Sequence, residues 1–296
     1  MTSRRDQLTG YLLLTPAVAV SAGVALIPVL VTVWFSLHRR QPIFGISDFV
    51  GLANYGFLVQ DPRFWNALGN TAYFAVVSVS LELVLGLGFA ELLDRQFRGR
   101  GVARALVLIP WAVPAVAAAR FWEWMFNPEV GILNYLLDAR INWLGDPVWA
   151  LHAAIVADVW KTTPFVVLLL LAGLQVIPRD LYRAAQVDGA TAWQTFRKVT
   201  LPLLLPVILL VLLFRTMDAA RLFDLIVVLT GGGPANETET LVVYAYALMY
   251  RTLQFGYGST VAVATFAVIF LVSLVYLRAL RRAWGLEATN AERGWG

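Results

Sequence analysis

The stretch YLLLTPAVAVSAGVALIPVLVTVWFSL, residues 11–37, contains no charged side chain. A helix needs about 20 consecutive apolar residues to cross a hydrocarbon core about 30 Å thick, so this stretch is long enough to span a membrane. Arg4 and Arg5 precede it, as in some export signals, but the apolar region of a cleavable signal peptide is only about 7–15 residues long. We therefore expect a permanent membrane anchor here.

The rest of the chain has the same apolar character. Of its 296 residues, 59% are hydrophobic and 14% are charged, against about 45–50% and about 25% in soluble domains. Five further stretches are long and apolar enough to span a membrane, namely 67–93, 102–126, 149–176, 201–229 and 259–280. Because a chain within lipid must satisfy its own backbone hydrogen bonds, we predict an all-α polytopic bundle of six transmembrane helices over residues 11–282.

Lysines and arginines predict how this bundle is oriented, since cytoplasmic loops are enriched in both residues. With a cytoplasmic N-terminus, most of the 23 basic residues fall on the cytoplasmic side. The predicted outer loops then hold only Arg39, Arg40, Arg63, Arg140 and Arg251. We expect both termini, residues 1–10 and 283–296, to lie on the cytoplasmic side of the cytoplasmic membrane.

Several kinds of chemistry are excluded or disfavoured by residues that the chain lacks. It contains no cysteine, which excludes disulfides, thiolate metal sites and cysteine nucleophiles, and its two histidines, His38 and His152, are far apart. It also lacks the G-x-x-x-x-G-K-[ST] loop that holds nucleotide phosphates. We therefore expect no catalytic residue, no metal and no cofactor in this chain, and no nucleic-acid partner.

The predicted cytoplasmic loop at 177–200 has its own structure. A first short helix would end at Gly189, because glycine readily takes the left-handed conformation that terminates helices. A second would cover about 190–198 and lead into the fifth span. The small side chains of Ala184 and Ala185 would let another protein approach closely, although a plain amphipathic helix on the membrane surface fits the pattern equally well.

Three motifs between residues 160 and 234 resemble those of a known family. The run RAAQVDGA at 183–190, followed by VTLP at 199–202, resembles the EAA signature of ABC importer permeases: Glu-Ala-Ala, three residues, Gly, nine residues, Ile-x-Leu-Pro. Two further motifs, WKTTPF at 160–165 and LTGGGP at 229–234, are similar to those of the sugar-permease branch typified by maltose and glycerol-phosphate importers. The sequence of the chain is most similar to that of trehalose-import permeases. The resemblance covers residues 10–282 and implies the type I permease fold.

In that family the EAA loop is a coupling helix, which sits in a cleft of a cytoplasmic ATPase and moves when the ATPases close on ATP. The resemblance therefore implies that ATPase coupling rests on Arg183, Ala184, Ala185, Asp188, Gly189, Leu201 and Pro202. One position departs from the family pattern, because Arg183 takes the place of the usual glutamate. An arginine here would be complementary to an acidic residue on the ATPase, where the usual glutamate would be complementary to a basic one. We expect the helix still to dock by its shape.

Charged residues within the predicted spans need a partner or a function, since each costs about 2.5–3.5 kcal/mol at the centre of a membrane helix. In a continuous helix over 201–229, Arg215, Asp218, Ala219 and Leu222 would share a face. Buried ion pairs between helices and a polar passage for sugar explain such residues equally well, and for Glu82 and Arg120 the interhelical pair is preferred. The resemblance to maltose permeases implies a substrate path lined by Lys161, Thr162, Phe165, Arg215, Asp218, Ala219, Leu222 and Asp224.

The function implied by the resemblance is that of a permease subunit that forms half of the pore of an ATP-driven sugar importer, with a disaccharide of the trehalose or maltose type as substrate. Its partners would be a second permease subunit, two cytoplasmic ATPases that bind ATP and Mg²⁺, and an extracytoplasmic solute-binding protein. That protein would dock on the outer loops near 48–66, 127–146 and 231–258. The alternative is a secondary transporter driven by an ion gradient, in which the charges of the fifth span relay protons.

Overall fold

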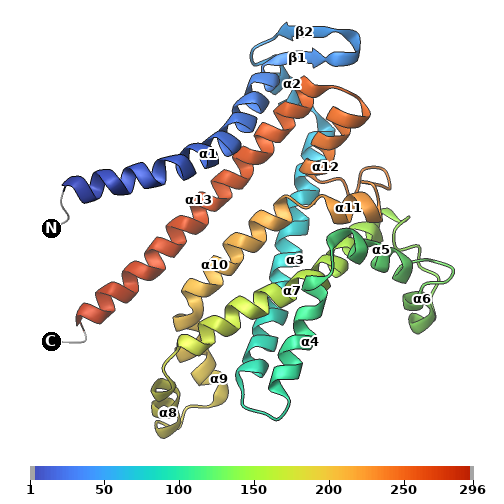
Figure 1. Ribbon diagram of the computed structural model, residues 1–296. Coiled ribbons are helices and arrows are strands. Elements are labelled where there is room, and N and C mark those ends of the chain that lie inside the picture. The colour runs from blue at the N-terminus through green and yellow to red at the C-terminus, as the bar shows by residue number, and fades with distance from the viewer. Residues whose placement is uncertain (1–3, 294–296) are drawn as a thin grey trace. The chain divides into compact units, whose positions relative to one another are not determined.

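A computed structural model describes the backbone of residues 4–293 and the side chains of residues 12–283 (Figure 1). Of the predicted cytoplasmic termini, residues 1–3 and 294–296 lie outside the described residues. The chain forms two compact units, Met1–Phe64 with Tyr244–Phe266 and Trp65–Val243 with Ala267–Gly296. The boundaries between them fall close to the start of α3 and within α12 and α13.

The first unit contains the helix predicted at 11–37 and a small hairpin that the sequence did not predict. Its elements are α1 (Arg4–Ser36), β1 (His38–Gln41), β2 (Ile46–Phe49), α2 (Ala53–Gln60), the second half of α12 (Leu241–Tyr246), and the first part of α13 (Phe255–Arg293). The strands pair antiparallel with His38 opposite Phe49, and Gly45 closes the turn at φ +64°. A side chain at Gly256 would collide with the His38 carbonyl, so glycine lets α13 begin directly against the hairpin.

The second unit is a bundle organised around one helix. Its elements are α3 (Pro62–Asp94), α4 (Arg100–Ala112), α5 (Ala115–Met125), α6 (Ile132–Leu137), α7 (Pro147–Val176), α8 (Arg179–Val187), α9 (Ala192–Thr195), α10 (Leu201–Ala220) and α11 (Asp224–Leu229), followed by the last part of α13. α7 packs against α4, α5, α10 and α11 (Figure 1). Small residues such as Ala154 and Ala157 and large ones such as Val166 and Leu170 are buried along it, so α7 is the core of this unit.

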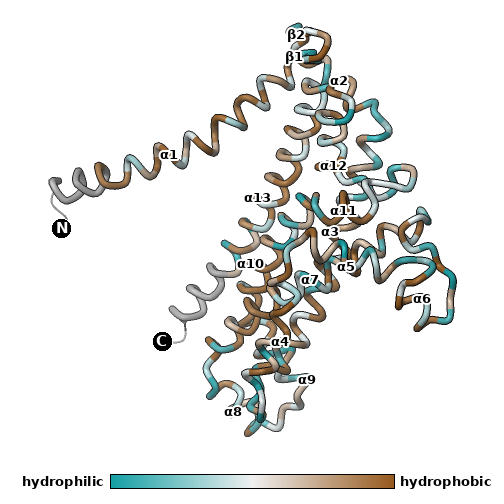
Figure 2. Tube along the Cα trace, turned by 45° about the vertical axis from the view of Figure 1, so that its right-hand side comes forward, coloured by the Kyte–Doolittle hydropathy of each residue, from teal (hydrophilic) through white to brown (hydrophobic). Residues whose placement is uncertain are grey.

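In the described part of the chain, five helices are long and apolar enough to cross a membrane, at Leu12–Ser36, Pro62–Asp94, Pro147–Val176, Ala192–Ala220 and Phe255–Ala283. A sixth crossing requires α4 and α5 to count as one span. Figure 2 shows the apolar residues of α10 and α13 in brown and hydrophilic residues gathered in the α8 region in teal. Many large apolar side chains along these helices are exposed, as expected of surfaces that face lipid.

The third predicted span is not one straight helix. The sequence predicts a helix over 102–126, whereas the structure bends by 92° between α4 and α5. Val113 is extended and Pro114 precedes α5. A proline has no N–H to donate to the preceding turn and forces the residue before it out of helical geometry, which explains the break.

The fifth predicted span, 201–229, is also wrong as a single helix, because α10 ends at Ala220 and α11 starts at Asp224. At the end of α10 the Arg221 side chain donates to the Met217 carbonyl at 3.1 Å, and the Thr240 hydroxyl donates to the Leu222 carbonyl at 3.2 Å. These side chains satisfy carbonyls that a longer helix would have bonded itself. Leu222 lies between the two helices, so the prediction that it shares a helical face with Arg215 is wrong.

Candidate functional sites: the cytoplasmic loop and the buried charge cluster

The loop between α7 and α10 folds as two short helices separated by a glycine. α8 ends at Val187, and Gly189 has a φ of +73°, as predicted for the left-handed residue after a helix. The Gly189 amide donates to the Gln186 carbonyl at 3.1 Å, and the Ala190 amide donates to the Ala185 carbonyl at 2.9 Å. This pair of bonds is a Schellman motif, which closes the helix and turns the chain.

The second helix starts with a capping box. The Thr191 hydroxyl accepts from the Gln194 amide at 3.3 Å, and the Gln194 side chain accepts from the Thr191 amide at 2.8 Å. α9 then passes through a π-helical turn, Phe196–Thr200, directly into α10. Pro202 cannot donate to the preceding turn, which accounts for the local widening. The predicted second helix is thus continuous with the fifth span.

A carboxylate ties the loop to the ends of two other helices. Asp94, the last residue of α3, accepts two hydrogen bonds from the Arg179 guanidinium in α8, at 2.7 and 3.0 Å. Arg100, the first residue of α4, lies 4.0 Å from the same carboxylate. Both contacts come from the Arg179 Nη2 atom, and a hydrogen bond between a guanidinium and a carboxylate is stronger than one between neutral groups. A cavity of about 460 Å³ lies between this junction and α9, lined among others by Glu91, Tyr182 and Phe196.

A second site lies deep between α3, α7 and α10, where Arg215 bonds to two acids. Its Nε donates to Glu82 Oε2 at 2.6 Å and its Nη2 to Glu82 Oε1 at 2.8 Å. Nη2 also donates to Asp158 Oδ2 at 3.2 Å. The side chains of Arg215, Glu82 and Asp158 are at most 5% exposed. We call these three residues the buried charge cluster.

A hydroxyl and a second ion pair adjoin the cluster. The Thr162 hydroxyl lies 2.7 Å from Glu82 Oε1 and 2.6 Å from the Asp158 carbonyl, so its one hydrogen can serve either, and it accepts from Arg215 at 3.2 Å. Asp218 lies 3.7 Å from the far side of the Arg215 guanidinium and accepts from Arg221 at 2.6 Å. The side chains of Asp218 and Arg221 are about half exposed, so polarity extends from the cluster to the surface of this unit.

Residues 82–284 match the family described as binding-protein-dependent transport system inner membrane components. The chain belongs to this family. The permease is 46% identical over 278 residues to the trehalose/maltose transport system permease protein MalF of Thermococcus litoralis, an alignment that covers 93% of this chain and 94% of the relative. It is 39% identical over 274 residues to the trehalose transport system permease protein SugA of Mycobacterium tuberculosis, covering 92% and 89%.

Solved structures share the fold of the permease. A bacterial ABC transporter involved in the import of the acidic polysaccharide alginate matches with a TM-score of 0.79, at 24% identity, over 94% of this chain and 96% of that chain. The predicted family and the predicted fold class, a helical ABC importer permease, are therefore confirmed. The chain is an integral membrane permease subunit, and nothing in these comparisons supports a carrier driven by an ion gradient.

The predicted coupling residues of the permease lie together on the loop. Ala184, Asp188 and Gly189 are exposed, Ala185 is half-buried, and Leu201 and Pro202 begin α10. Arg183 is exposed and donates to Asp180 at 3.0 Å in the same helix. Sequence reasoning missed Val187 and Trp193, which are 88% and 68% exposed on the same loop. The signal was available, because both are large apolar residues in a polar stretch.

The predicted path residues of the permease do not all come together. Thr162, Arg215 and Asp218 do, whereas Ala219 is buried in the core and Phe165 stacks on Trp111 with ring centroids 5.9 Å apart. Lys161 and Leu222 are half-buried, and Asp224 is exposed in the first turn of α11. The bonds of Arg215 fit the interhelical ion pair, and its role in a substrate path stays a prediction.

Two other charged residues were expected to form interhelical pairs. For Glu82 this is confirmed by its bonds to Arg215. For Arg120 it is wrong, because Arg120 pairs with Glu123 at 2.5 Å within α5, and both side chains are substantially exposed. The bend at Pro114 gives α5 a direction that a straight helix over 102–126 would not have. The two residues are three positions apart on one face of α5, where side chains meet.

Proposed function

We propose that this permease is the membrane subunit of an ATP-driven importer whose substrate is a disaccharide of the trehalose or maltose type. The observation that carries the proposal is the 46% identity to a trehalose/maltose permease across 93% of the chain. The 39% identity to a trehalose permease supports the same substrate class. Similarity across nearly the whole length includes the loops as well as the spans, so it supports a shared assembly and not the fold alone.

The cytoplasmic loop is proposed to receive the movement of a separate ATPase, which binds ATP and Mg²⁺ and carries out the hydrolysis. Most residues from Arg183 to Gly189 are exposed, as is Trp193, so the loop offers a surface that a cleft could hold. Large exposed apolar side chains on a polar loop are typical of a protein contact. The Asp94–Arg179 bond would then carry displacement of the loop to α3.

The substrate path is proposed to use the Asp218–Arg221 pair at the end of α10. Sugar hydroxyls need hydrogen-bond donors and acceptors, and this pair offers both on half-exposed side chains. Arg215 would support the pair from behind, since its guanidinium is buried and bonded to Glu82, Asp158 and Thr162. Lys161, Thr162, Phe165, Ala219, Leu222 and Asp224 complete the proposed path.

The remaining features of the assembly follow from the same proposal. The permease would form half of the pore beside a second permease subunit, with two ATPases below and an extracytoplasmic binding protein on the outer loops. It would lie in the cytoplasmic membrane with both termini in the cytoplasm. Asp48, Glu129 and Asp146 are among the charges that the outer loops offer for docking.

The test is reconstitution of the assembled importer with its binding protein in liposomes, followed by a screen of disaccharides and monosaccharides for stimulation of ATP hydrolysis. Trehalose or maltose should stimulate hydrolysis and accumulate inside. Stimulation by an unrelated solute alone would overturn the substrate class. Accumulation driven by a proton or sodium gradient without ATP would overturn the importer itself.

A further inference from the structure

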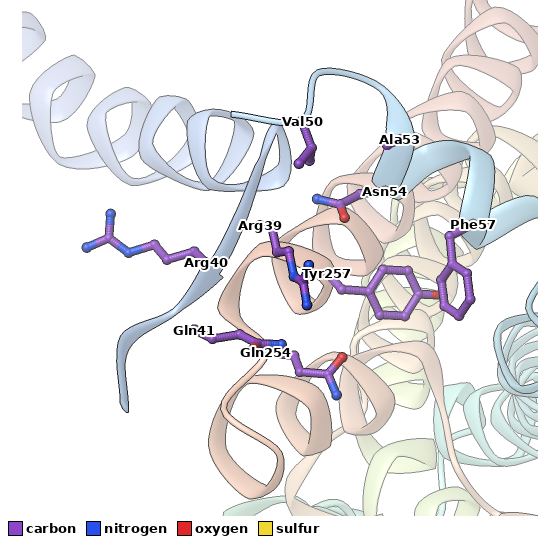
Figure 3. A pocket seen from close by; sticks show the side chains of 9 residues that line it. All are labelled: Arg39, Arg40, Gln41, Val50, Ala53, Asn54, Phe57, Gln254 and Tyr257. Carbon is purple, nitrogen blue, oxygen red and sulfur yellow. The ribbon is translucent and has the colours of Figure 1, made fainter. Parts of the chain in front are cut away.

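Two adjacent arginines in the first unit have no part in the functions proposed above. Arg39 and Arg40 lie in β1, directly after the first span, and are two of the few basic residues on the predicted outer side. Both are among the residues that line a cavity of about 270 Å³; Figure 3 shows the Arg39 side chain directed toward Tyr257 and Gln254, and the Arg40 side chain directed away from them, as expected of consecutive residues in a strand. Its walls include Gln41 from the same strand, Asn54 from α2, and Gln254 and Tyr257 from the start of α13.

The wall of this cavity is held in place by hydrogen bonds. Asn54 donates to the Ser36 carbonyl at 2.8 Å and to the His38 carbonyl at 3.1 Å, which fixes α2 against the hairpin. The Tyr257 hydroxyl donates to Asp61. Because these hydrogens are already used, the donors left for a ligand in the cavity are the Arg39 guanidinium and the side-chain amides of Gln41 and Gln254.

The charge at the cavity is not neutralised within the described part of the chain. Asp48 is the cross-strand neighbour of Arg39, yet among residues 12–283 no carboxylate oxygen lies within 4.0 Å of either guanidinium. Arg40 packs over the Phe35 ring at 4.2 Å, which supports its position without removing its charge. A cavity that contains the Arg39 guanidinium, with the charge of Arg40 nearby, attracts an anion, and guanidinium binds phosphate in a matching planar geometry.

The surroundings of the cavity indicate where that phosphate comes from. Ile43, Phe44 and Phe49 in the hairpin are each about two-thirds exposed, and Trp34 at the end of α1 is more than half exposed. Aromatic residues at the end of an apolar helix, next to arginines, are typical of the boundary between hydrocarbon and lipid headgroups. A free anion would gain nothing from this apolar rim.

We propose that Arg39, with Gln41 and Gln254, binds the phosphate of an anionic phospholipid headgroup at the outer surface of the membrane, and that the charge of Arg40 on the other face of the strand adds to the attraction. The Arg39 guanidinium donates to the phosphate oxygens, the two amides donate to the headgroup beside it, and the apolar rim contacts the start of the acyl chains. The proposal adds a lipid site to the permease and rests on the predicted outer position of the hairpin, not on the identity of the sugar.

The test measures lipid binding to the assembled importer in detergent by native mass spectrometry, with phosphatidylglycerol and phosphatidylcholine as probes. The double variant Arg39→Gln/Arg40→Gln should bind phosphatidylglycerol about 30-fold more weakly at this site, from the usual contribution of two basic side chains near an anionic surface. Arg39→Lys/Arg40→Lys keeps the charge and should retain most of the affinity. The control, Arg251→Gln, removes an exposed arginine of the predicted outer side that is not among the residues lining the cavity, and it should bind within twofold of the unaltered importer.

Unchanged binding in the glutamine variant, or equal loss in the Arg251→Gln control, would overturn the proposal. Inorganic phosphate at millimolar concentration provides a second arm. If it binds at these arginines while phosphatidylglycerol does not, the ligand is a free anion and the lipid assignment is wrong. If the glutamine variant weakens docking of the extracytoplasmic binding protein but not lipid binding, the surface serves a protein instead.

Discussion

The cytoplasmic loop and the buried charge cluster are both built from arginines and carboxylates, but they use them in opposite ways. Arg183 and Asp180 lie 3.0 Å apart with both side chains more than three-quarters exposed, where such a pair contributes about 0.3–0.5 kcal/mol. Arg215 and its two acids are almost fully buried. A surface pair leaves its charges free to meet a partner, whereas a buried pair commits its charges to joining helices.

The largest expected effect is on the buried side of this comparison. Arg215→Met would leave Glu82 and Asp158 buried without their cation, and breaking a buried pair from one side costs about 3–5 kcal/mol. We expect the purified complex to unfold at a clearly lower temperature, as measured by thermal unfolding in detergent. The matched control is Arg221→Met, whose side chain is 58% exposed and which should cost about 1 kcal/mol or less. Equal destabilisation by both variants would contradict the distinction between the two regions.

On the exposed loop, we expect a substitution to abolish sugar uptake without preventing insertion of the permease into the membrane. Gly189→Val places a β-branched side chain at a φ of +73° and on the surface proposed to dock, so uptake should fail although the permease still inserts. Radiolabelled sugar uptake and membrane immunoblots measure the two separately. Gly99→Val is the control, since Gly99 has a φ of +90°, precedes α4 and has open space around it. Normal uptake in Gly189→Val would remove this residue from coupling.

Asp218 is intermediate between the exposed loop and the buried charge cluster. Asp218 contacts the buried Arg215 on one side and the exposed Arg221 on the other. Asp218→Ala should reduce the sugar-stimulated part of ATP hydrolysis in the assembled complex several-fold, with smaller change in basal hydrolysis. Glu123→Ala removes a half-exposed acid that pairs with Arg120 in α5, outside the loop and the proposed path, and serves as the control. An unchanged response to sugar in Asp218→Ala would take Asp218 out of the substrate path.

The smallest expected effect concerns a carboxylate that belongs to neither region. Burial raises the pKa of Asp61, but hydrogen bonds from the Tyr244 and Tyr257 hydroxyls and from backbone amides outweigh it, so the pKa of Asp61 is lower than usual. A depressed pKa in the folded state gives stability that is present above the unfolded pKa, about 3.9, and is lost as the pH falls through the folded value. Asp61→Asn should therefore weaken the acid dependence of thermal stability below about pH 4. An identical pH profile in the two proteins would show that Asp61 contributes no such linkage.

How far the sequence could predict each region depends on how local its signals are. The amides of Gly189 and Ala190 bond to carbonyls three and five positions earlier, and the capping box at Thr191 spans four residues. Because these signals are local, the loop could be predicted well. The cluster joins Glu82 to Arg215 across 133 positions. The sequence showed that each charge needed a partner, but only the packing of three helices selects which one.

The two broken spans and the hairpin were missed for related reasons. Pro114 was visible in the third span, but prolines at 16, 28 and 164 lie inside helices that are not broken, so proline alone does not locate a bend. Beyond the end of α10, the Thr240 hydroxyl donates to the Leu222 carbonyl, a contact across 18 positions that no local pattern indicates. The strands of the hairpin are four residues each, too short for an alternating pattern to show.

The carboxylate of Asp94 has a consequence for how the permease can move. It receives Arg179 from the loop and lies near Arg100 at the start of α4, while belonging itself to the end of α3. A displacement of the loop that keeps the Arg179 bond would pull on the end of α3, and through Arg100 more weakly on the start of α4. The chain turns between α3 and α4 within residues 95–99, so one carboxylate is the point at which the end of α3 and the starts of α4 and α8 meet.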